Sequence, residues 1–455
     1  MTSSKHGNPV ASSIATRLEA ILGPDAILPS SVLESYAIDG LVPQAAVRPA
    51  DREGVAVTMA WAFSEKAAVS PMGGGTQSDL GNVPNRLDLV LDLGRLNRVL
   101  DFQPEDLTVT VEAGIPLTTL QTALAKGGMF LPLEAPLPHR ATIGGILAAS
   151  PSGPRRFAYG LPRDWLIGIS VVSAGGIETK AGGKVVKNVT GYDLNRLYTG
   201  SLGTLGVIIE ATFKIAPLPA HSQVLAASFG SIAAAIQAGR NLLNQPYSPQ
   251  GVQALNGEAA QRLGEPGDHP ALVLVLFEGP SASLMERRVQ ECSRILNEAG
   301  AIGVTAMSGS QDPSILDRLT DLGWRGGQEP YLMMKINLPP SRVADMVEEC
   351  RRDSPLGLTP GVLADVGFGM VRLFWWMGDD AEAVDRPAAM AAIERVRELA
   401  TAAGGNAIVE RCPAAVKRDI DVWGGAPQDI EMMRRVKERF DPSGILNPGR
   451  FVGGI

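Results

Sequence analysis

Three consecutive glycines, Gly73 to Gly75, constrain this chain more than any other feature of its sequence. They stand in the stretch AAVSPMGGGTQSDLG, between an apolar run typical of a strand and a polar loop. Glycine loses more conformational entropy on folding than any other residue, so three in a row indicate a tight turn or a close approach to the backbone. The stretch therefore predicts either a plain glycine turn or a loop whose backbone holds a ligand.

The two best-known phosphate-binding loops do not match this stretch. A Walker A loop needs a lysine directly after its last glycine, whereas the next lysine here is Lys126. A dinucleotide fingerprint needs a helix after its glycines, whereas Asn82, Pro84 and Asn85 are turn residues. Backbone N–H groups, with the hydroxyls of Thr76 and Ser78, can instead form a nest that holds a pyrophosphate without a cation.

Two further segments combine glycines with hydroxyl side chains. Residues 136–156 contain Gly144 and Gly145 beside Thr142, and residues 184–217 contain Gly200, Gly203 and Gly206 just before an apolar strand. Each segment alone is compatible with a simple turn. Together the three predict one extended ligand that is covered by backbone.

Composition limits the function classes. A chain of 455 residues is too long for one ordinary core, so we expect two or three domains. The net charge of -7 and the lack of a basic block disfavour a nucleic-acid partner. The three cysteines, Cys292, Cys350 and Cys412, stand far apart, so no metal site is expected.

The apolar runs are all far too short to span a bilayer, and the N-terminus lacks the apolar core of a signal peptide. We therefore expect a cytoplasmic protein. Any attachment to the inner face of the membrane would come through partner subunits.

The strand and helix pattern changes at the proline-punctuated segment 216–223. Before it, glycine-rich strands and helices are mixed. After it, strand patterns such as 271–279 and 331–338 alternate with helical patterns such as 282–300 and 388–405. This alternation predicts a second α+β domain, over residues 218–435, in which one antiparallel sheet is backed by helices.

Three motifs in this order carry a family resemblance: SPMGGGTQSDLG, ATIGGILAASPSGP and GYDLNRLYTGSLGTLGVIIE. They resemble the FAD-binding domain of the vanillyl-alcohol-oxidase, or PCMH-type, flavoproteins. The ending FDPSGILNPGRF is similar to the closing segment of that family, which returns to the flavin domain. The resemblance implies an α+β fold with a two-subdomain FAD-binding domain over residues 1–217, a cap over 218–435 and a returning segment over 436–455.

The segments SGPRR, RDWLIG and KVVKNVTGYDL are similar to the FAD-binding E subunits of bacterial glycolate oxidases. The resemblance implies FAD as cofactor, and non-covalent FAD because the glycine loop contains neither histidine nor cysteine. The residues that would bind it are Pro71, Met72, Gly73, Gly74, Gly75, Thr76, Gln77, Ser78, Pro136, Thr142, Gly144, Gly145, Gly153, Gly206, Val207, Asn447 and Arg450.

The catalytic groups are harder to assign. Oxidation of a 2-hydroxy acid needs a base, which is usually a histidine. The 2-hydroxy-acid dehydrogenases of this family carry a histidine cluster in the C-terminal half, whereas this chain has no histidine after His269. His139, three residues before Thr142, could face the flavin or be a structural loop histidine.

Several cations are candidates for binding a substrate carboxylate. Arg155, Arg156 and Arg163 are close in sequence, but ion pairs or a subunit interface explain them equally well. Arg372 alternates with Leu373 along the strand pattern FGMVRLFWWMG, so it would line a cap pocket or pack in the core. Lys335 is equally ambiguous. The catalytic residues stay unassigned, with His139 and Arg372 as candidates.

Three hypotheses follow for function. The first is an FAD-carrying subunit that takes part in oxidising glycolate to glyoxylate, beside a catalytic flavoprotein paralogue and an iron–sulfur subunit that passes electrons onward. The second is a self-contained FAD-dependent dehydrogenase with a non-histidine base. The third is a scaffold subunit that has lost FAD.

Overall fold

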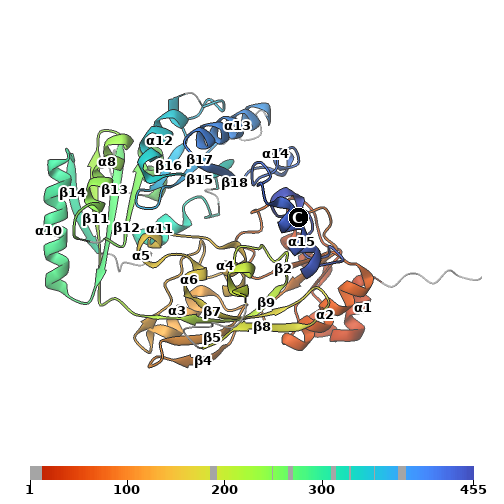
Figure 1. Cartoon of the computed structure of the whole chain (residues 1–455). Coiled ribbons are helices and arrows are strands. Elements are labelled where there is room, and N and C mark those ends of the chain that lie inside the picture. The colour runs from red at the N-terminus through yellow and green to blue at the C-terminus, as the bar shows by residue number, and fades with distance from the viewer. Residues whose placement is uncertain are drawn as a thin grey trace, which may run out of the picture.

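The computed structural model describes residues 13–184, 192–247, 249–264, 270–308, 314–326, 329–352, 354–377 and 386–455. Most of the segment KVVKNVTGYDL, residues 185–191, lies outside these ranges, as do His6 and His269. The described chain is α+β, with an N-terminal part built on two main sheets and a C-terminal part built on one large sheet (Figure 1). The predicted fold class is confirmed.

The first sheet of the N-terminal part is small and parallel. Its order is β1-β3-β2, formed by Ala45–Val47, Leu89–Asp92 and Val69–Met72. Helices α1 (Ile14–Leu22) and α2 (Arg52–Glu65) pack on it through an apolar core that includes Leu18, Met59 and Leu91. The glycine-rich stretch begins where β2 ends, so the parallel sheet fixes the start of the loop.

The second sheet is five-stranded and antiparallel in the order β4-β5-β9-β7-β8. Its strands are Val99–Gln103, Thr108–Glu112, Val207–Lys214, Leu166–Val172 and Glu178–Gly182. Its core is closed by α3 (Leu117–Ala125) and α4 (Ile143–Ala149). Short elements complete this part: β6 (Met129–Phe130), β10 (Ala216–Pro217), α5 (Arg156–Tyr159), α6 (Pro162–Trp165) and α7 (Leu194–Tyr198).

The C-terminal part is built on an eight-stranded antiparallel sheet, which we call the cap sheet, in the order β14-β11-β13-β12-β16-β17-β15-β18. In chain order its strands are β11 (His221–Phe229), β12 (Gly251–Asn256), β13 (Ala271–Gly279), β14 (Gly303–Ser308), β15 (Leu332–Asn337), β16 (Gly361–Asp365), β17 (Met370–Trp375) and β18 (Asn406–Arg411).

Helices cover the two faces of the cap sheet unequally. One face is packed by four long helices, α8 (Ile232–Leu243), α10 (Ala282–Glu298), α12 (Val343–Arg352) and α13 (Arg386–Ala402). Among the described residues, the other face carries only the short helices α9 (Gly257–Leu263) and α11 (Ile315–Asp321). This second face is turned toward the N-terminal part, because the Leu137 N–H donates to Asp321 of α11 at 2.8 Å. Strands β16, β17, β15 and β18 therefore present part of this face to the N-terminal part, and no long helix of the described ranges lies over it (Figure 1).

The end of the chain returns to the small parallel sheet. After α14 (Ala414–Lys417) and α15 (Ile430–Phe440), the Val69 N–H of β2 donates to the Ile445 carbonyl at 2.7 Å. The Asn447 N–H donates to the Val69 carbonyl at 3.0 Å. Residues 445–447 thus pair in parallel with the free edge of β2, directly beside the glycine-rich loop.

Candidate FAD and substrate site

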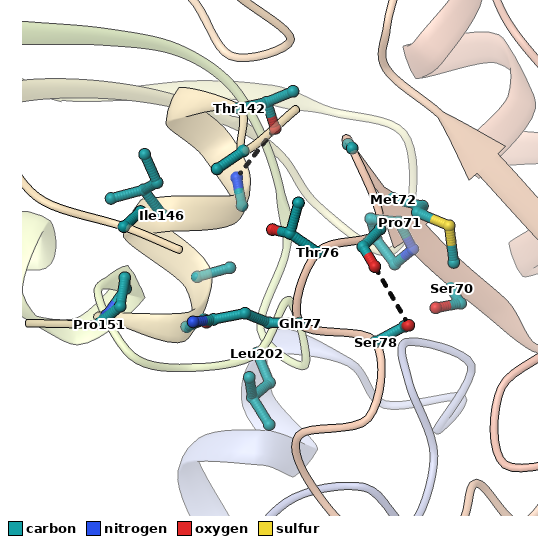
Figure 2. A pocket seen from close by; sticks show the side chains of 18 of the residues that line it. Ser70, Pro71, Met72, Thr76, Gln77, Ser78, Thr142, Ile146, Pro151 and Leu202 are labelled. Carbon is teal, nitrogen blue, oxygen red and sulfur yellow. Dashed lines mark hydrogen bonds between the residues drawn. The ribbon is translucent and has the colours of Figure 1, made fainter. Parts of the chain in front are cut away.

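A pocket lies where the glycine-rich loop, helix α4 and the C-terminal segment meet. Figure 2 shows Thr76 and Gln77 pointing from the loop toward α4. Thr142 caps α4, because its hydroxyl accepts from the Gly145 N–H. Of the residues predicted to bind FAD, those that line this pocket are Pro71, Met72, Gly73, Gly74, Gly75, Thr76, Gln77, Ser78, Thr142, Gly145, Asn447 and Arg450.

The glycines of the loop are required for two different reasons. A side chain at Gly73 would overlap the Thr142 hydroxyl, and one at Gly74 would overlap the Arg140 carbonyl. These two glycines therefore let the loop pack directly on the segment before α4. Gly75 has a positive φ of 65°, which disfavours any other residue. The close approach that the sequence predicts at Gly73 and Gly74 is thus made by the protein's own chain.

The loop leaves hydrogen-bonding groups free for a ligand. Among the described residues, none accepts a hydrogen bond from the backbone N–H groups of residues 73–77. Asn447 Oδ1 and Arg450 Nε are buried at the pocket wall and also have no partner in the described chain. Because unpaired buried polar groups are costly, these groups indicate a polar ligand with anionic character. The donors suit a pyrophosphate and the amide oxygen suits a donor group, so the residues present fit FAD.

Five predicted FAD ligands lie outside the pocket wall. Gly144 packs on Ala113, Gly153 on Glu134 and Gly206 on Val171, so each is small for the sake of protein packing. Pro136 is buried in the segment before α4, and Val207 lies in β9 paired with Val172. Contact of these five residues with FAD remains a prediction.

Several residues of the pocket were not predicted from the sequence. They are mostly small or apolar, and no motif distinguishes them from core residues: Ser70, Ala135, Ala141, Ile146, Ala148, Ala149, Pro151 and Leu202. Leu202 belongs to the third glycine-rich segment, so all three glycine-rich segments contribute residues to this pocket.

A cluster of buried charges lies on the cap-sheet face that is turned toward the N-terminal part. Arg372 of β17 donates from Nε to Glu410 Oε2 at 2.8 Å, and Lys335 Nζ lies 3.5 Å from Glu410 Oε1. Arg372 and Glu410 are only 6% and 5% exposed. No other hydrogen bond of the Arg372 guanidinium is present among the described residues. Two cations therefore share one carboxylate, and the guanidinium keeps donors for a further anion.

Two contacts connect this cluster to the walls of the pocket. On β17, Met370 Sδ lies 3.7 Å from the hydroxyl of Ser152, the residue after the pocket-lining Pro151. On β18, Arg411 forms an ion pair at 2.7 Å with Asp79, which follows Ser78. Arg372 and Glu410 adjoin these two contacts along their strands, so the cluster faces the region between α4 and the glycine-rich loop.

Burial and the neighbouring charges together set the protonation of the cluster. Burial alone would raise the pKa of Glu410, but Arg372 and Lys335 together hold that pKa below its ordinary value, so the carboxylate is ionised. Burial lowers the pKa of Lys335, and Arg372 lowers it further while Glu410 opposes the change. The ammonium form of Lys335 thus depends on neighbouring negative charge, which a bound carboxylate would increase.

The other three candidate cations have different environments in the structure. Arg155 forms ion pairs with Glu134 at 3.1 Å and with Glu278 at 2.8 Å, so the intramolecular alternative holds for this residue. Arg156 stacks on Phe368, with its guanidinium carbon 3.7 Å from the ring centroid. Arg163 is exposed beside Asp164.

His139 is exposed and lies outside the pocket of the glycine-rich loop. It lines a second cavity of about 590 Å³ between that loop and the cap, together with Trp324 and Arg411. Contact of His139 with a flavin remains a prediction.

Among the described residues, no group of three or more histidine, cysteine, aspartate or glutamate side chains is arranged to hold a metal ion. The three cysteines are free and buried, and burial raises the pKa of each thiol to about 12. No helix in the described ranges is long and apolar enough to cross a membrane.

Comparisons with known proteins agree with this arrangement. The FAD binding domain family matches residues 43–182, and the C-terminal domain family of FAD linked oxidases matches residues 218–451. The glycolate oxidase subunit GlcD of Bacillus subtilis is 27% identical over 423 residues, 90% of this chain and 89% of that protein. The glycolate oxidase subunit GlcE of Escherichia coli is 36% identical over 162 residues, 35% of this chain and 46% of that protein. These relatives support the family without singling out the E subunit.

The fold is also shared with solved structures. p-Cresol methylhydroxylase superposes with a TM-score of 0.75 at 18% identity, covering 96% of this chain and 95% of that one. Such a low identity carries the fold only, and the fold agrees with the predicted PCMH-type architecture. With both family models matched in order along one chain, this protein belongs to the FAD-linked oxidases and is an FAD-binding oxidoreductase.

Proposed function

We propose that this chain is an FAD-carrying subunit of a glycolate-oxidase-like complex and takes part in oxidising a small 2-hydroxy acid, with glycolate to glyoxylate as the leading reaction. The observation that carries the substrate class is the buried Arg372–Glu410–Lys335 cluster on the cap face beside the FAD pocket. The relatives named as glycolate oxidase subunits support the same class.

The chain's own residues would hold the cofactor as follows. The free N–H groups of residues 73–77 would bind the pyrophosphate, and Arg450 Nε adds a donor at the same wall. Asn447 Oδ1 would accept a hydrogen bond from the flavin or its ribityl chain. FAD bound there supplies the acceptor for the hydride that leaves the substrate carbon.

The substrate carboxylate would bind to the free donors of Arg372, with Lys335 as the second cation. Glu410 holds the Arg372 Nε and thereby fixes the plane of the guanidinium. A monocarboxylate arriving there would balance a cluster that carries two positive charges and one negative charge. Bound in this way, the acid would have its hydroxyl-bearing carbon directed toward the FAD pocket.

This chain does not supply the histidine base that is usual for this reaction. No histidine follows His269, so the histidine cluster of the related dehydrogenases is missing. This absence supports a division of labour in which a catalytic flavoprotein paralogue completes the reaction and an iron–sulfur subunit passes the electrons onward.

One observation favours the second candidate, a self-contained dehydrogenase with a carboxylate base. Asp365 of β16 is fully buried, its Oδ2 has no partner among the described residues, and burial raises its pKa to about 6. A carboxylate with that pKa accepts a proton near neutral pH. It lies on the same sheet face as Arg372.

The deciding experiment is co-purification from the native host, with flavin and iron assayed both in the complex and in this chain alone. We expect the complex to contain a second flavoprotein and iron, and to reduce an artificial acceptor with glycolate while this chain alone does not. Recovery of a lone, fully active monomer would contradict the complex and support the second candidate.

Variants within the purified complex test the substrate site. Arg372→Met should raise the KM for glycolate at least tenfold, because the carboxylate loses its bidentate partner. Arg163→Met removes an exposed arginine and is the matched control. Equal KM values for the two variants would show that the acid binds elsewhere.

A further inference from the structure

A buried lysine of the cap contacts the loop that would hold the FAD pyrophosphate. Lys417 ends helix α14, and its side chain is 1% exposed. Its Nζ lies 2.8 Å from Asp39 Oδ1 and donates to the Asp79 carbonyl. A lysine is rarely buried this deeply unless its charge is needed where it lies.

Lys417 acts beside Arg450 on three consecutive carbonyls. Arg450 donates from Nη2 to the carbonyls of Ser78 and Leu80, and Lys417 donates to the carbonyl between them, that of Asp79. Two buried cations therefore hold the carbonyl oxygens of residues 78–80. This anchors the chain just after the free N–H groups of residues 73–77.

The rest of the same cap segment reinforces this anchor. Arg411 pairs with the Asp79 carboxylate at 2.7 Å, and the Val422 N–H donates to Asn82 Oδ1 at 2.8 Å. The Trp423 indole donates to the Arg450 carbonyl at 3.0 Å. Residues 411–423 thus contact both the end of the glycine-rich loop and the arginine that lies at its pocket.

We propose that Lys417 is a positioning residue for FAD: its contacts with Asp39 and the Asp79 carbonyl hold the glycine-rich loop, residues 73–79, in the geometry that binds the pyrophosphate. Lys417 does not line the pocket itself, so it acts through the loop backbone. The cap domain, which carries the substrate cluster, thereby also controls retention of the cofactor. This inference rests on FAD binding and is independent of which acid is oxidised.

The test must separate positioning of the loop from simple neutralisation of Asp39. Lys417→Met alone leaves Asp39 buried without its cation, so that variant can fail to fold. The double variant Lys417→Met/Asp39→Asn removes both charges, and asparagine tolerates the positive φ of 50° at position 39. Lys180→Met, which removes an exposed lysine paired with Glu210, is the matched control.

The readout is the dissociation constant of FAD, measured by flavin fluorescence on each apoprotein, with its thermal midpoint recorded in parallel. We expect the double variant to recover the thermal midpoint of the wild type but to bind FAD about tenfold more weakly, as for loss of one hydrogen bond from a charged group. Lys417→Arg should retain most of the affinity, and Lys180→Met all of it.

Unchanged FAD affinity in the double variant would overturn the proposal and reduce Lys417 to the counter-ion of Asp39. A second measurement distinguishes a change in the loop from a general loss of stability. Amide hydrogen exchange of peptides covering residues 73–82 should be faster in the apo double variant than in the apo wild type, while exchange in β7 stays the same. Equal exchange at residues 73–82 would also overturn it.

Discussion

The Nε atom of Arg372 on β17 lies 2.8 Å from Oε2 of Glu410 on β18, and water reaches little of either side chain. Breaking such a pair leaves one buried charge uncompensated, which usually costs about 3–5 kcal/mol. The position of the pair, between the contacts of Met370 and Arg411 with the N-terminal part, makes it a structural element as well as the anion site proposed above.

Arg372→Met should therefore lower the free energy of unfolding by about 3 kcal/mol, the low end of that range, because Lys335 stays 3.5 Å from Glu410. Urea unfolding of the apoprotein measures this. Adding Glu410→Gln should restore part of the loss, since the orphaned carboxylate is removed. Strictly additive effects of the two changes would show that the pair is not coupled in the folded protein.

Glycine substitutions should separate folding from cofactor binding. At Gly145 an added methyl group would meet only the Thr142 hydroxyl, at 3.3 Å, and the position is helical and lines the pocket. Gly145→Ala should therefore keep or raise the thermal midpoint, since alanine favours helix by about 1 kcal/mol, while it weakens FAD binding.

Gly73→Ala should instead destabilise the apoprotein, because its methyl group would overlap the Thr142 hydroxyl. We expect a lower thermal midpoint of the apoprotein together with lost flavin. Paired fluorescence titrations and thermal scans check both variants. Equal loss of stability in the two would refute the view that Gly73 is required for packing of the loop while Gly145 is not.

The sequence was sufficient for the fold class, and it singled out many of the residues that line the pocket of the glycine-rich loop, whose contact with FAD stays a prediction. Three glycine-rich motifs in one order predicted the family, and the alternation around Arg372 was correct, since Leu373 and Trp375 lie in the core that the long helices cover. Such motifs can be predicted because each is local in sequence, and the types of its residues indicate the backbone geometry.

The contacts that complete the site could not be predicted in this way. Lys417 contacts Asp39 across 378 residues, and Glu410 pairs with Arg372 from a different strand. The order of strands in the cap sheet brings β17 and β18 to either side of β15, and no local pattern encodes that order. The packing of Gly73 and Gly74 on Thr142 and Arg140 could not be predicted for the same reason, because these neighbours are distant in the chain.

Arg155 should be essential for docking the cap on the N-terminal part. It bridges Glu134, before α4, and Glu278, at the end of β13. Burial alone would lower the pKa of Arg155, but the two carboxylates outweigh burial and hold that pKa above its ordinary value. Arg155→Met should destabilise the apoprotein by about 3–5 kcal/mol. Adding Glu134→Gln and Glu278→Gln should recover much of that loss in urea unfolding. No recovery in the triple variant would assign the loss to packing of the arginine stem instead.

Asp365 should give the protein a distinctive dependence on pH. Burial raises its folded-state pKa to about 6 from the ordinary value of 3.8, so the folded protein binds a proton more tightly than the unfolded chain. Its contribution favours folding most below pH 4 and is lost as the pH rises from about 4 to about 6. The two pKa values correspond to a difference on the order of 3 kcal/mol.

Asp365→Asn removes this titration and keeps an oxygen that can accept from the Phe368 N–H. The difference in unfolding free energy between the variant and the wild type should therefore shift in favour of the variant between pH 4 and pH 6 and stay constant above pH 7. Urea midpoints at half-unit pH intervals measure the difference, in which the titration of all other groups cancels. A difference independent of pH would show that folding does not shift the pKa of Asp365, and would remove it as a base of the second candidate function.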